Sequence, residues 1–585
     1  MPNNFILKGI LILVFLFFLC CPWVCEAFCI EPTNVPRFFV ASLFLILGII
    51  IHFFRKKVYI LPPTTLIVLI FAFYFVNIIS ATWALNATDA IFESQKIALG
   101  ILLFIWVYDQ ISSAINERFI LNTLSIVFFT TLCITFYEWS IQINEFKTSI
   151  FGHKNLLSSF LFLSLAFWLY CFRVVTNRLK WVYLIGFILT VSCILLIQTR
   201  SAILALIVAV FFFIMTCIYA HLKLKARRIF LTTISATFLI VAFYGSKHFT
   251  NILSNTNDKN ASLVERVELW KNTTELIKEN PIIGVGTGNW QYNYSKFSIN
   301  NIDKARNYNT FFKRPHNDFL WVLSENGIIG FVLLICIIGY IGRVSIKMFL
   351  IDKDINRLIL LSGAVGFIMI SFFSFPKERV PHIILVAILL AFQFKGIHFD
   401  HAKKLKLNFK NVFVIIALLL LNCTIGYYRL KGEFYTKKAV LAQTSKEADK
   451  VIEFGTKAIS YFYTTDPSGT PIYSYIGWGY NLKTDLNELL SANEKAYQIS
   501  PYDYKVLSNY GYALLRIGLF DSASKVLSEA YRINSSYEPI LLNLSVLEFN
   551  RRNYALSLEW LEKIENYQIK YAQNYERIQM KISAK

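Results

Sequence analysis

The sequence is poor in charge, and in acidic residues above all. Only 16% of its 585 residues are charged while 56% are hydrophobic, and Asp and Glu number 37 against 58 Lys and Arg. A soluble domain carries about 25% charged residues, so this composition excludes an ordinary soluble protein. Residues 429–585 hold 20 Lys and Arg against 17 acidic residues. The first 428 residues hold the other 38 basic and 20 acidic residues, so most of the surplus of +21 belongs to basic membrane loops, and no nucleic acid partner is expected.

Cysteine is missing from the polar segments. All ten cysteines lie in or beside apolar runs, which predicts neither a disulfide framework nor a thiolate metal site. The polar loops also lack an acidic cluster and hold only scattered carboxylates such as Glu265, Asp303 and Asp318. Carboxylates are the usual ligands of the hard cations that assist catalysis. We therefore expect no metal and no other cofactor.

Long apolar runs recur through the first 428 residues. A membrane-spanning helix needs roughly 20 residues, and thirteen runs approach that length, the fourth and twelfth being the weakest. They lie near residues 10–23, 37–54, 64–83, 96–108, 119–139, 155–172, 181–198, 201–220, 229–246, 319–342, 357–375, 381–394 and 409–428. The first could pass for a signal peptide, but Cys21-Pro-Trp-Val-Cys25 is a poor cleavage site, which favours a retained helix. We predict an all-α polytopic membrane domain over residues 1–428.

Basic residues predict the orientation of these spans. Alternate connections are rich in Lys and Arg, which marks them as cytoplasmic. These connections contain Arg55 to Lys57, Arg173 to Lys180, Lys223 to Arg228, Arg343 to Arg357, and Lys395 to Lys410. The other side then receives a large loop at 247–318 and the tail after residue 428. We expect both to be external, which means periplasmic if the membrane is a bacterial inner membrane.

A period of 34 residues appears after the last apolar run. The segment from Glu494 to Pro501 realigns with the segment from Ser528 to Ser535 at that shift, and the pattern resembles tetratricopeptide repeats. Two units are clear, at about 501–534 and 535–568, so residues 429–585 are predicted to form a helical repeat domain. Such repeats bind peptides or partner proteins. A spacer that only stabilises the membrane domain is the alternative.

Polar residues precede the tenth apolar run at Arg314-Pro315-His316-Asn317-Asp318. This order places a titratable imidazole beside a fixed positive charge at a membrane surface, where chemistry on a lipid-borne anion would take place. Gly327-x-x-Gly330 follows in the apolar run. A helix-capping pair with glycines for close helix packing is the structural alternative.

Further cations occupy the predicted external side. Arg266 shares a helical face with Trp270, Thr273 and Ile277, and this helix must stop near Asn280-Pro281. The following Gly284-x-Gly286-x-Gly288 follows no strand, so we interpret it as a turn that lets backbone approach a ligand or the bilayer. Other external cations are Arg200 in a turn between two apolar runs, Lys154 within Phe151-Gly-His-Lys-Asn155, and Lys377 and Arg379 without a clear motif. For Arg200, snorkelling to the headgroups is the alternative, and for Lys154, a basic helix start with an Asn cap.

The order of these motifs resembles bacterial O-antigen ligases and the related polymerases and protein O-oligosaccharyltransferases. The resemblance rests on His316-Asn317 with Gly327-x-x-Gly330, on Arg266 with the glycine-rich turn, on Arg200-x-x-x-Leu204 and on Gly152-x-x-Asn155, and it covers about residues 150–345. It implies a glycosyltransferase of lipopolysaccharide or polysaccharide biosynthesis in the bacterial inner membrane. The donor would be a glycan on undecaprenyl or another polyprenyl diphosphate, transferred with inversion.

The resemblance also implies roles for individual residues. His316 would act as general base on the acceptor hydroxyl, and Asn317, Gly327 and Gly330 would support the motif. The diphosphate would be bound by Arg200 and Arg266, with Arg314 and Lys154 as further candidates.

The acceptor stays open at this point. The core of lipid A is the first choice, while a growing polysaccharide and a protein hydroxyl are the alternatives, and the repeat domain favours a protein partner only slightly. A membrane scaffold that presents the repeats gives no reason for the His-Asn motif. A transporter would place charges and broken helices near the membrane midplane, whereas these Arg and His residues lie at one face.

Overall fold

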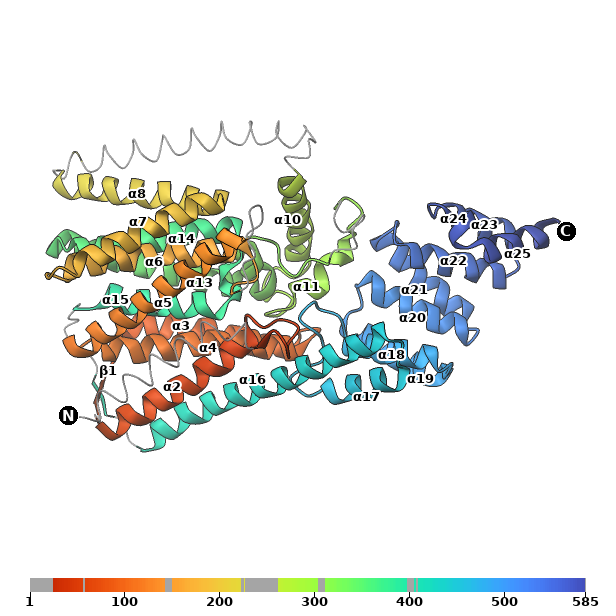
Figure 1. Cartoon of the computed structure of the whole chain (residues 1–585), viewed down its shortest axis with the longest axis horizontal. Helices are drawn as coiled ribbons and strands as arrows, with labels where there is room; N and C mark the ends of the chain where they lie inside the picture. The colour runs from red at the N-terminus through yellow and green to blue at the C-terminus, as the bar shows by residue number, and fades with distance from the viewer. Residues whose placement is uncertain are drawn as a thin grey trace.

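The computed structural model describes residues 25–55, 58–141, 150–222, 226, 261–302, 311–396, 404–406 and 409–583. In these residues the protein is almost entirely helical, and a short antiparallel pairing joins β1 (Val58–Ile60) to β2 (Lys404–Lys406). Long apolar helices lie side by side in a bundle, and the C-terminal helices extend from one end of it (Figure 1). The predicted all-α polytopic membrane fold is confirmed.

Ten helices among the described residues are long and apolar enough to cross a membrane. They are α2 (Val35–Arg55), α3 (Thr64–Ile79, continued by η1, Ser80–Thr82), α4 (Ala87–Gln110), α5 (Ala114–Ile141), α6 (Lys154–Val174), α7 (Lys180–Ile197), α8 (Arg200–His221), α13 (Asp318–Asp352), α14 (Ile355–Phe373) and α16 (Phe409–Thr444). The weak twelfth run is the shorter apolar helix α15 (Val380–Phe394). The predicted spans near 10–23 and 229–246 lie outside the described residues.

Helix α6 lies in the middle of the bundle and is the most buried of the long helices. Trp168 on α6 is fully buried and donates from its indole nitrogen to Thr190 of α7 at 3.0 Å. Small residues let neighbouring helices approach, since Gly186 lies against the Trp168 ring and Gly366 of α14 lies against Phe162. The close packing of α6 fixes where its first residue stands at the end of the bundle, which matters for the site below.

The large loop is described at 261–302 and 311–318. It contributes α10 (Ala261–Glu279), α11 (Trp290–Asn293) and η3 (Tyr294–Phe297), and η4 (Pro376–Glu378) joins α14 to α15. α10 and α11 lie at the same end of the bundle as the C-terminal helices (Figure 1). The segments expected to be external therefore lie together, although their side of the membrane stays a prediction.

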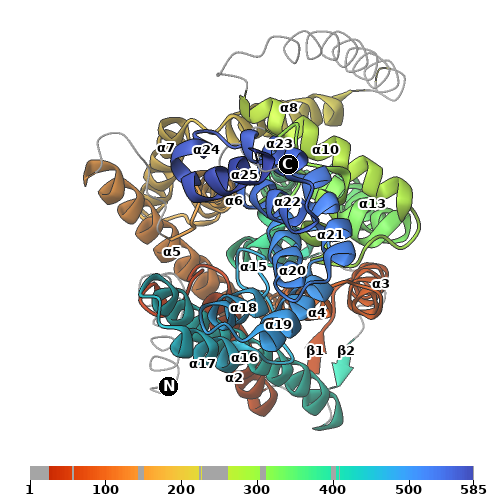
Figure 2. The same ribbon diagram turned by 90° about the vertical axis from the view of Figure 1, so that its right-hand side faces the viewer.

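Helix α16 continues without a break through residue 428, where the membrane domain was expected to end. It is followed by α17 (Ala448–Ala458), α18 (Ile472–Leu482), α19 (Leu486–Ile499), α20 (Tyr504–Arg516), α21 (Phe520–Ile533), α22 (Glu538–Asn550), α23 (Tyr554–Glu562), α24 (Tyr567–Lys570) and α25 (Ala572–Ser583). Consecutive helices pack in pairs, and Gly511 of α20 lies directly against Leu527 of α21. The pairs α20–α21 and α22–α23 fall in the two predicted 34-residue units. Seen end-on, these helices lie in front of the bundle (Figure 2).

Candidate active site

The connection between α14 and α15, residues 374–379, lies at the centre of the predicted site. His316 meets the Phe375 ring edge-on with 4.9 Å between ring centroids, and the Arg314 guanidinium lies 4.4 Å from the same centroid. His153 approaches from the start of α6 with its ring centroid 6.0 Å away. The structure thus joins the two predicted residues Arg314 and His316 through Phe375, and it adds His153.

A cavity of about 450 Å³ opens beside Phe375. His153, Arg314 and His316 line it together with Phe375. Further lining residues come from the segment before α18 and from the start of α20. The complete lining is His153, Phe311, Phe312, Lys313, Arg314, His316, Phe375, Ser468, Thr470, Asp503 and Lys505. We call this space the His316 cavity.

A tight turn presents the imidazole of His316 to this cavity. His316 has a left-handed backbone with φ 58°, which is uncommon for a residue other than glycine. The Asn317 side chain then accepts hydrogen bonds from the backbone N–H groups of Phe319 and Leu320, each at 3.0 Å, and so caps α13. The capping alternative therefore describes Asn317, whereas the imidazole beside it lines the cavity.

Helix α13 is interrupted at Gly327, whose φ is 60° and ψ is −166°. The glycine-rich loop fills the interruption, because Val285 donates to the carbonyl of Ser324 at 3.0 Å and Ile328 donates to that of Pro281 at 2.9 Å. A Cβ on Gly327 would lie 2.2 Å from a carbonyl oxygen of this loop. Only glycine fits there. The loop was expected to approach a ligand or the bilayer, but its backbone contacts among the described residues are to α13 and to the segment around η1, where Thr287 donates to Ser80 at 2.9 Å and Trp83 donates to the carbonyl of Gly284 at 3.2 Å. Gly330 lies one turn further on.

The predicted face of α10 packs toward the site. Arg266 donates to the carbonyl oxygen of Phe373 at 3.2 Å, just before the central connection. Trp270 donates to the carbonyl oxygen of Pro315 at 2.7 Å, which holds the residue before His316 in place. Helix α10 thereby ties the His316 turn to the end of α14.

Three of the predicted diphosphate-binding cations, Arg314, Lys154 and Arg266, lie close enough to His153 to affect its pKa. Burial lowers the pKa of His153 to about 4, and neighbouring positive charges add to this effect. Those charges belong to Arg314, Lys154, Arg379 and Arg266. Burial also lowers the pKa of Arg266; Glu265 opposes this change, and the exposed Arg200 at the start of α8 adds to it. The cations thus lie within electrostatic reach of one another, next to a histidine that is neutral at pH 7.

Residues 185–335 match the family model for O-antigen ligase. The chain carries an O-antigen ligase domain. The match runs from α7 into α13 and contains Arg200, Arg266, Arg314 and His316, whereas Lys154 and the C-terminal helices lie outside it. No curated protein matches the chain. The predicted likeness to O-antigen ligases is therefore confirmed over residues 185–335.

Arg314 of the ligase domain has an ion-pair partner in the central connection. Its guanidinium lies 2.7 Å from the carboxylate of Glu378, which also lies 3.6 Å from Arg379. Burial would raise the pKa of Glu378, but the two guanidinium groups outweigh it and hold that pKa at about 2. Arg314 can contact a diphosphate only while sharing its charge with this carboxylate.

A second cavity of about 100 Å³ brings together carboxylates that are far apart in the sequence. Glu31, Asp89, Glu93, Glu378, Glu433 and Asp466 line it, together with Lys313, Arg314 and Arg429. The expectation that the acids stay scattered was wrong here, because the fold joins the starts of α2 and α4 to α16 and to the segment before α18. Basic partners neutralise several of these acids, for example Arg429 beside Asp89 at 2.6 Å. Among the described residues, no group of three or more His, Cys, Asp or Glu has an arrangement that could hold a metal ion.

A third cavity, of about 460 Å³, lies inside the bundle of apolar helices. Side chains from α3, α4, α13, α14 and α15 form its largely apolar walls, for example Ile70, Phe104 and Ile337. Its charged residues come from the starts of α4 and α13 and from the central connection, and they are Glu93, Lys96, Asp318 and Lys377. The connection 374–379 therefore lines both this apolar cavity and the His316 cavity.

Sequence reasoning missed three members of the site. His153 was quoted only inside a motif, Phe375 lay in an apolar run, and Glu378 was one acid among several. The basic Lys377-Glu378-Arg379 between two apolar runs was the signal that could have directed attention to this connection.

Proposed function

We propose that this protein transfers a glycan from a polyprenyl-diphosphate-linked donor to an acceptor hydroxyl at the end of the bundle that carries the His316 cavity. One observation supports this above the others. A histidine and a group of arginines lie around residues 374–379, and that same connection lines an apolar cavity between membrane helices. A substrate with a lipid tail, an anionic head and a polar glycan needs these three environments in this order.

The lipid tail and the diphosphate of the donor would bind in different environments of the site. The apolar cavity would hold part of the polyprenyl chain, because its walls are about as apolar as the lipid tails that the chain would leave. Arg266, with Arg200 and Lys154, would bind the diphosphate through charge-assisted hydrogen bonds, and a guanidinium can do so with two parallel bonds. Arg314 would add to this site while it remains paired with Glu378.

His316 would act as the general base. The neutral imidazole takes the proton of the acceptor hydroxyl as its oxygen bonds to the anomeric carbon of the donor sugar. The bond from that carbon to the diphosphate oxygen breaks, and the diphosphate leaves with its electron pair onto the cationic side. Attack from the opposite face inverts the anomeric configuration.

His153 would contribute a hydrogen bond. Its Nδ1 accepts from the backbone N–H of Asn155 at 3.1 Å, so the proton of the neutral ring resides on Nε2. A neutral N–H donor beside the arginines suits an oxygen of the leaving diphosphate. It adds a hydrogen bond without further positive charge.

The core of lipid A remains the first-choice acceptor, and the reaction would take place at the external face of a bacterial inner membrane. Polymerisation of repeat units and transfer to a protein hydroxyl use the same donor and are the alternatives. The residues after the membrane domain, 429–585, would form a periplasmic domain of tetratricopeptide type.

The test is deletion of the gene with complementation. Loss of the lipopolysaccharide ladder with accumulation of unligated polymer would support ligation. Loss of the polymer itself would indicate a polymerase, and loss of glycoprotein staining a protein glycosyltransferase. Wild-type protein should restore the lost product, and a His316→Ala protein present in equal amount should not. A deletion that changes none of the three would contradict the proposed function.

A further inference from the structure

We infer that the C-terminal helices bind the saccharide of the acceptor, through Ser468, Thr470, Asp503 and Lys505 on the wall of the His316 cavity. This inference rests on the proposed function and names the substrate that the wall contacts. The C-terminal region would then form part of the active site. Its role would go beyond that of a spacer or a docking module for other proteins.

The wall belongs to the same space as the general base. Ser468 and Thr470 lie in the segment before α18, and Asp503 and Lys505 lie at the start of α20, yet all four line the cavity that His316 lines. They are far from the ligase domain in the sequence, so only the fold brings them there.

The segment 466–470 has a well-defined shape. One carboxylate oxygen of Asp466 accepts from the backbone N–H groups of Ser468 at 2.7 Å and Thr470 at 2.9 Å, which is a stable turn. The other oxygen accepts from the hydroxyl of Tyr475 at 2.8 Å. At the tip, a Cβ on Gly469 would lie 3.0 Å from the Phe311 ring, so the turn rests against the cavity lining.

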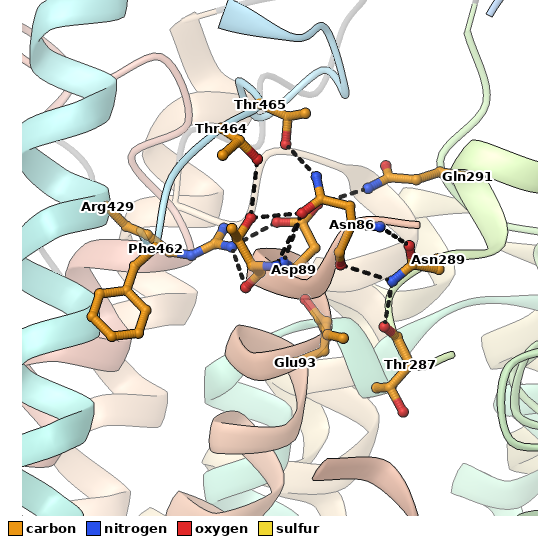
Figure 3. Close-up of polar contacts among 12 residues, drawn as sticks. Asn86, Asp89, Glu93, Thr287, Asn289, Gln291, Arg429, Phe462, Thr464 and Thr465 are labelled. Atoms are coloured by element: carbon orange, nitrogen blue, oxygen red, sulfur yellow. Dashed lines mark hydrogen bonds and ion pairs between the residues drawn. The ribbon is translucent and has the colours of Figure 1, made fainter. Parts of the chain in front are cut away.

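A polar network ties this segment to the membrane helices (Figure 3). Arg429 of α16 lies 2.6 Å from Asp89 in the first turn of α4, and it also donates to the backbone carbonyl of Thr88 at 3.0 Å. The Thr88 hydroxyl lies 3.2 Å from that of Thr464. Asn86, which caps α4, extends its amide to Thr465 at 3.4 Å. The network fixes residues 464–465 immediately before the turn.

A second set of hydrogen bonds fixes the start of α20 and the end of α21. Ser295 of η3 donates to the carbonyl oxygen of Tyr502 at 2.7 Å, directly before Asp503. Ile299 donates to the carbonyl oxygen of Ile533 at 3.0 Å. Both wall segments are therefore held by the loop and helix ends that build the site, which makes the wall a permanent part of the cavity.

The chemistry of the wall fits a saccharide better than a diphosphate. It presents two hydroxyls, one carboxylate and one ammonium group, and Asp503 would repel the diphosphate. Sugar hydroxyls can donate to the carboxylate and exchange hydrogen bonds with Ser468 and Thr470. Phe311 and Phe312 add aromatic surface for the apolar face of a sugar ring.

The direction of the reaction assigns this wall to the acceptor. In an inverting displacement the attacking oxygen arrives opposite the leaving group. The cations proposed to hold the leaving diphosphate, Arg266 and Lys154, come from α10 and α6 and are not among the residues that line this cavity. The C-terminal wall lines the same cavity as His316, the proposed base, so the acceptor hydroxyl and its saccharide would bind there.

The experiment uses the purified full-length protein with lipid A core from the host strain as acceptor and a polyprenyl-diphosphate-linked glycan as donor. Loss of a hydrogen bond to a charged group costs about 1.5–3 kcal/mol, or roughly 10-fold to 100-fold. Asp503→Asn should therefore raise the KM for the acceptor at least about tenfold and leave the KM for the donor unchanged. Asparagine also caps helices well, so α20 should persist. Ser468→Ala should act in the same direction but more weakly.

Asp485→Asn is the matched control. Asp485 caps α19 with its side chain as Asp503 caps α20, but it does not line the cavity. It should leave both KM values unchanged. An unchanged acceptor KM in Asp503→Asn and Ser468→Ala, or a raised donor KM instead, would overturn the inference while the proposed function stood.

A binding measurement distinguishes failure of the proposed saccharide site from failure of the proposed glycan transfer. Delipidated core oligosaccharide should bind the wild type and His316→Ala equally, and Asp503→Asn clearly more weakly, in saturation-transfer NMR. If the wild type transferred no glycan but showed this pattern, the proposed function would fail and the saccharide site would remain. Equal binding by wild type and Asp503→Asn would overturn the site itself.

Discussion

The guanidinium of Arg314 lies 2.7 Å from the carboxylate of Glu378, and both side chains are largely buried, at 15% and 14% exposure. This pair joins the segment before His316 to the connection between α14 and α15. The second guanidinium near the carboxylate, that of Arg379, also pairs with Glu31 at 2.5 Å. The Glu378 carboxylate thus neutralises charge on the segment before His316, through Arg314, and on the connection itself, through Arg379.

Glu378→Gln should therefore destabilise the protein strongly. Removing one partner of a buried pair leaves an uncompensated charge and costs about 3–5 kcal/mol. We expect a clear fall in the thermal unfolding midpoint of the purified protein. Glu453→Gln is the control, because its pair with Lys457 is about half exposed and such pairs contribute little. Equal midpoints for Glu378→Gln and the wild type would show that the pair is not structurally important.

His153 should make stability depend on pH. Its pKa in the folded protein is lowered to about 4 by partial burial and by the surrounding cations, against 6.5 in the unfolded chain. The stability from this lowered pKa is fully present above pH 6.5 and is lost as the pH falls through 4. His153→Asn should flatten this part of the stability profile while keeping a cap on α6. Thermal unfolding from pH 7 to pH 4 measures the difference. Parallel curves for variant and wild type would contradict the assignment.

Local features of the site could be predicted from the sequence. The polar residues before an apolar run predicted a helix start, and α13 begins at Asp318 with Asn317 as its cap. The spacing on α10 predicted that Arg266 and Trp270 share a face, and both side chains contact residues of the site. These features depend on residues within one or two helical turns of each other. The spacing of such residues along the sequence shows which of them lie on the same face of a helix.

Contacts between distant segments could not be predicted. Asp89 and Arg429 form an ion pair across 340 positions, and Asp503 lines the same cavity as His316. A single sequence shows which segments are helical and charged, but it does not show which helix ends meet. The acids that looked scattered therefore converge, and the C-terminal region that looked separate contributes residues to the lining of the cavity.

Arg266 should affect donor binding as well as turnover. Loss of a charge-assisted contact to the diphosphate costs about 1.5–3 kcal/mol, so Arg266→Ala should weaken donor binding by at least about tenfold. Arg266→Lys should rescue little, since an ammonium group cannot reproduce the planar fork of a guanidinium. Direct binding of the lipid-linked donor measures this. Lys271→Ala on the exposed part of the same helix is the control and should bind normally. Full rescue by lysine would argue for a point charge without bidentate contact.

His316 is the strictest test of the chemistry. If its imidazole takes the proton of the acceptor, His316→Ala should reduce transfer by roughly two to four orders of magnitude, the usual contribution of a general base. Membrane insertion and donor binding should stay near wild type, because Asn317 still caps α13. His221→Ala, at the exposed end of α8, is the control and should retain activity. Transfer by the wild type should decline at acid pH, where a protonated imidazole cannot accept a proton, and it should persist in EDTA. An enzyme that keeps its activity as His316→Ala but loses it in EDTA would show that a metal ion, and not this histidine, carries the reaction.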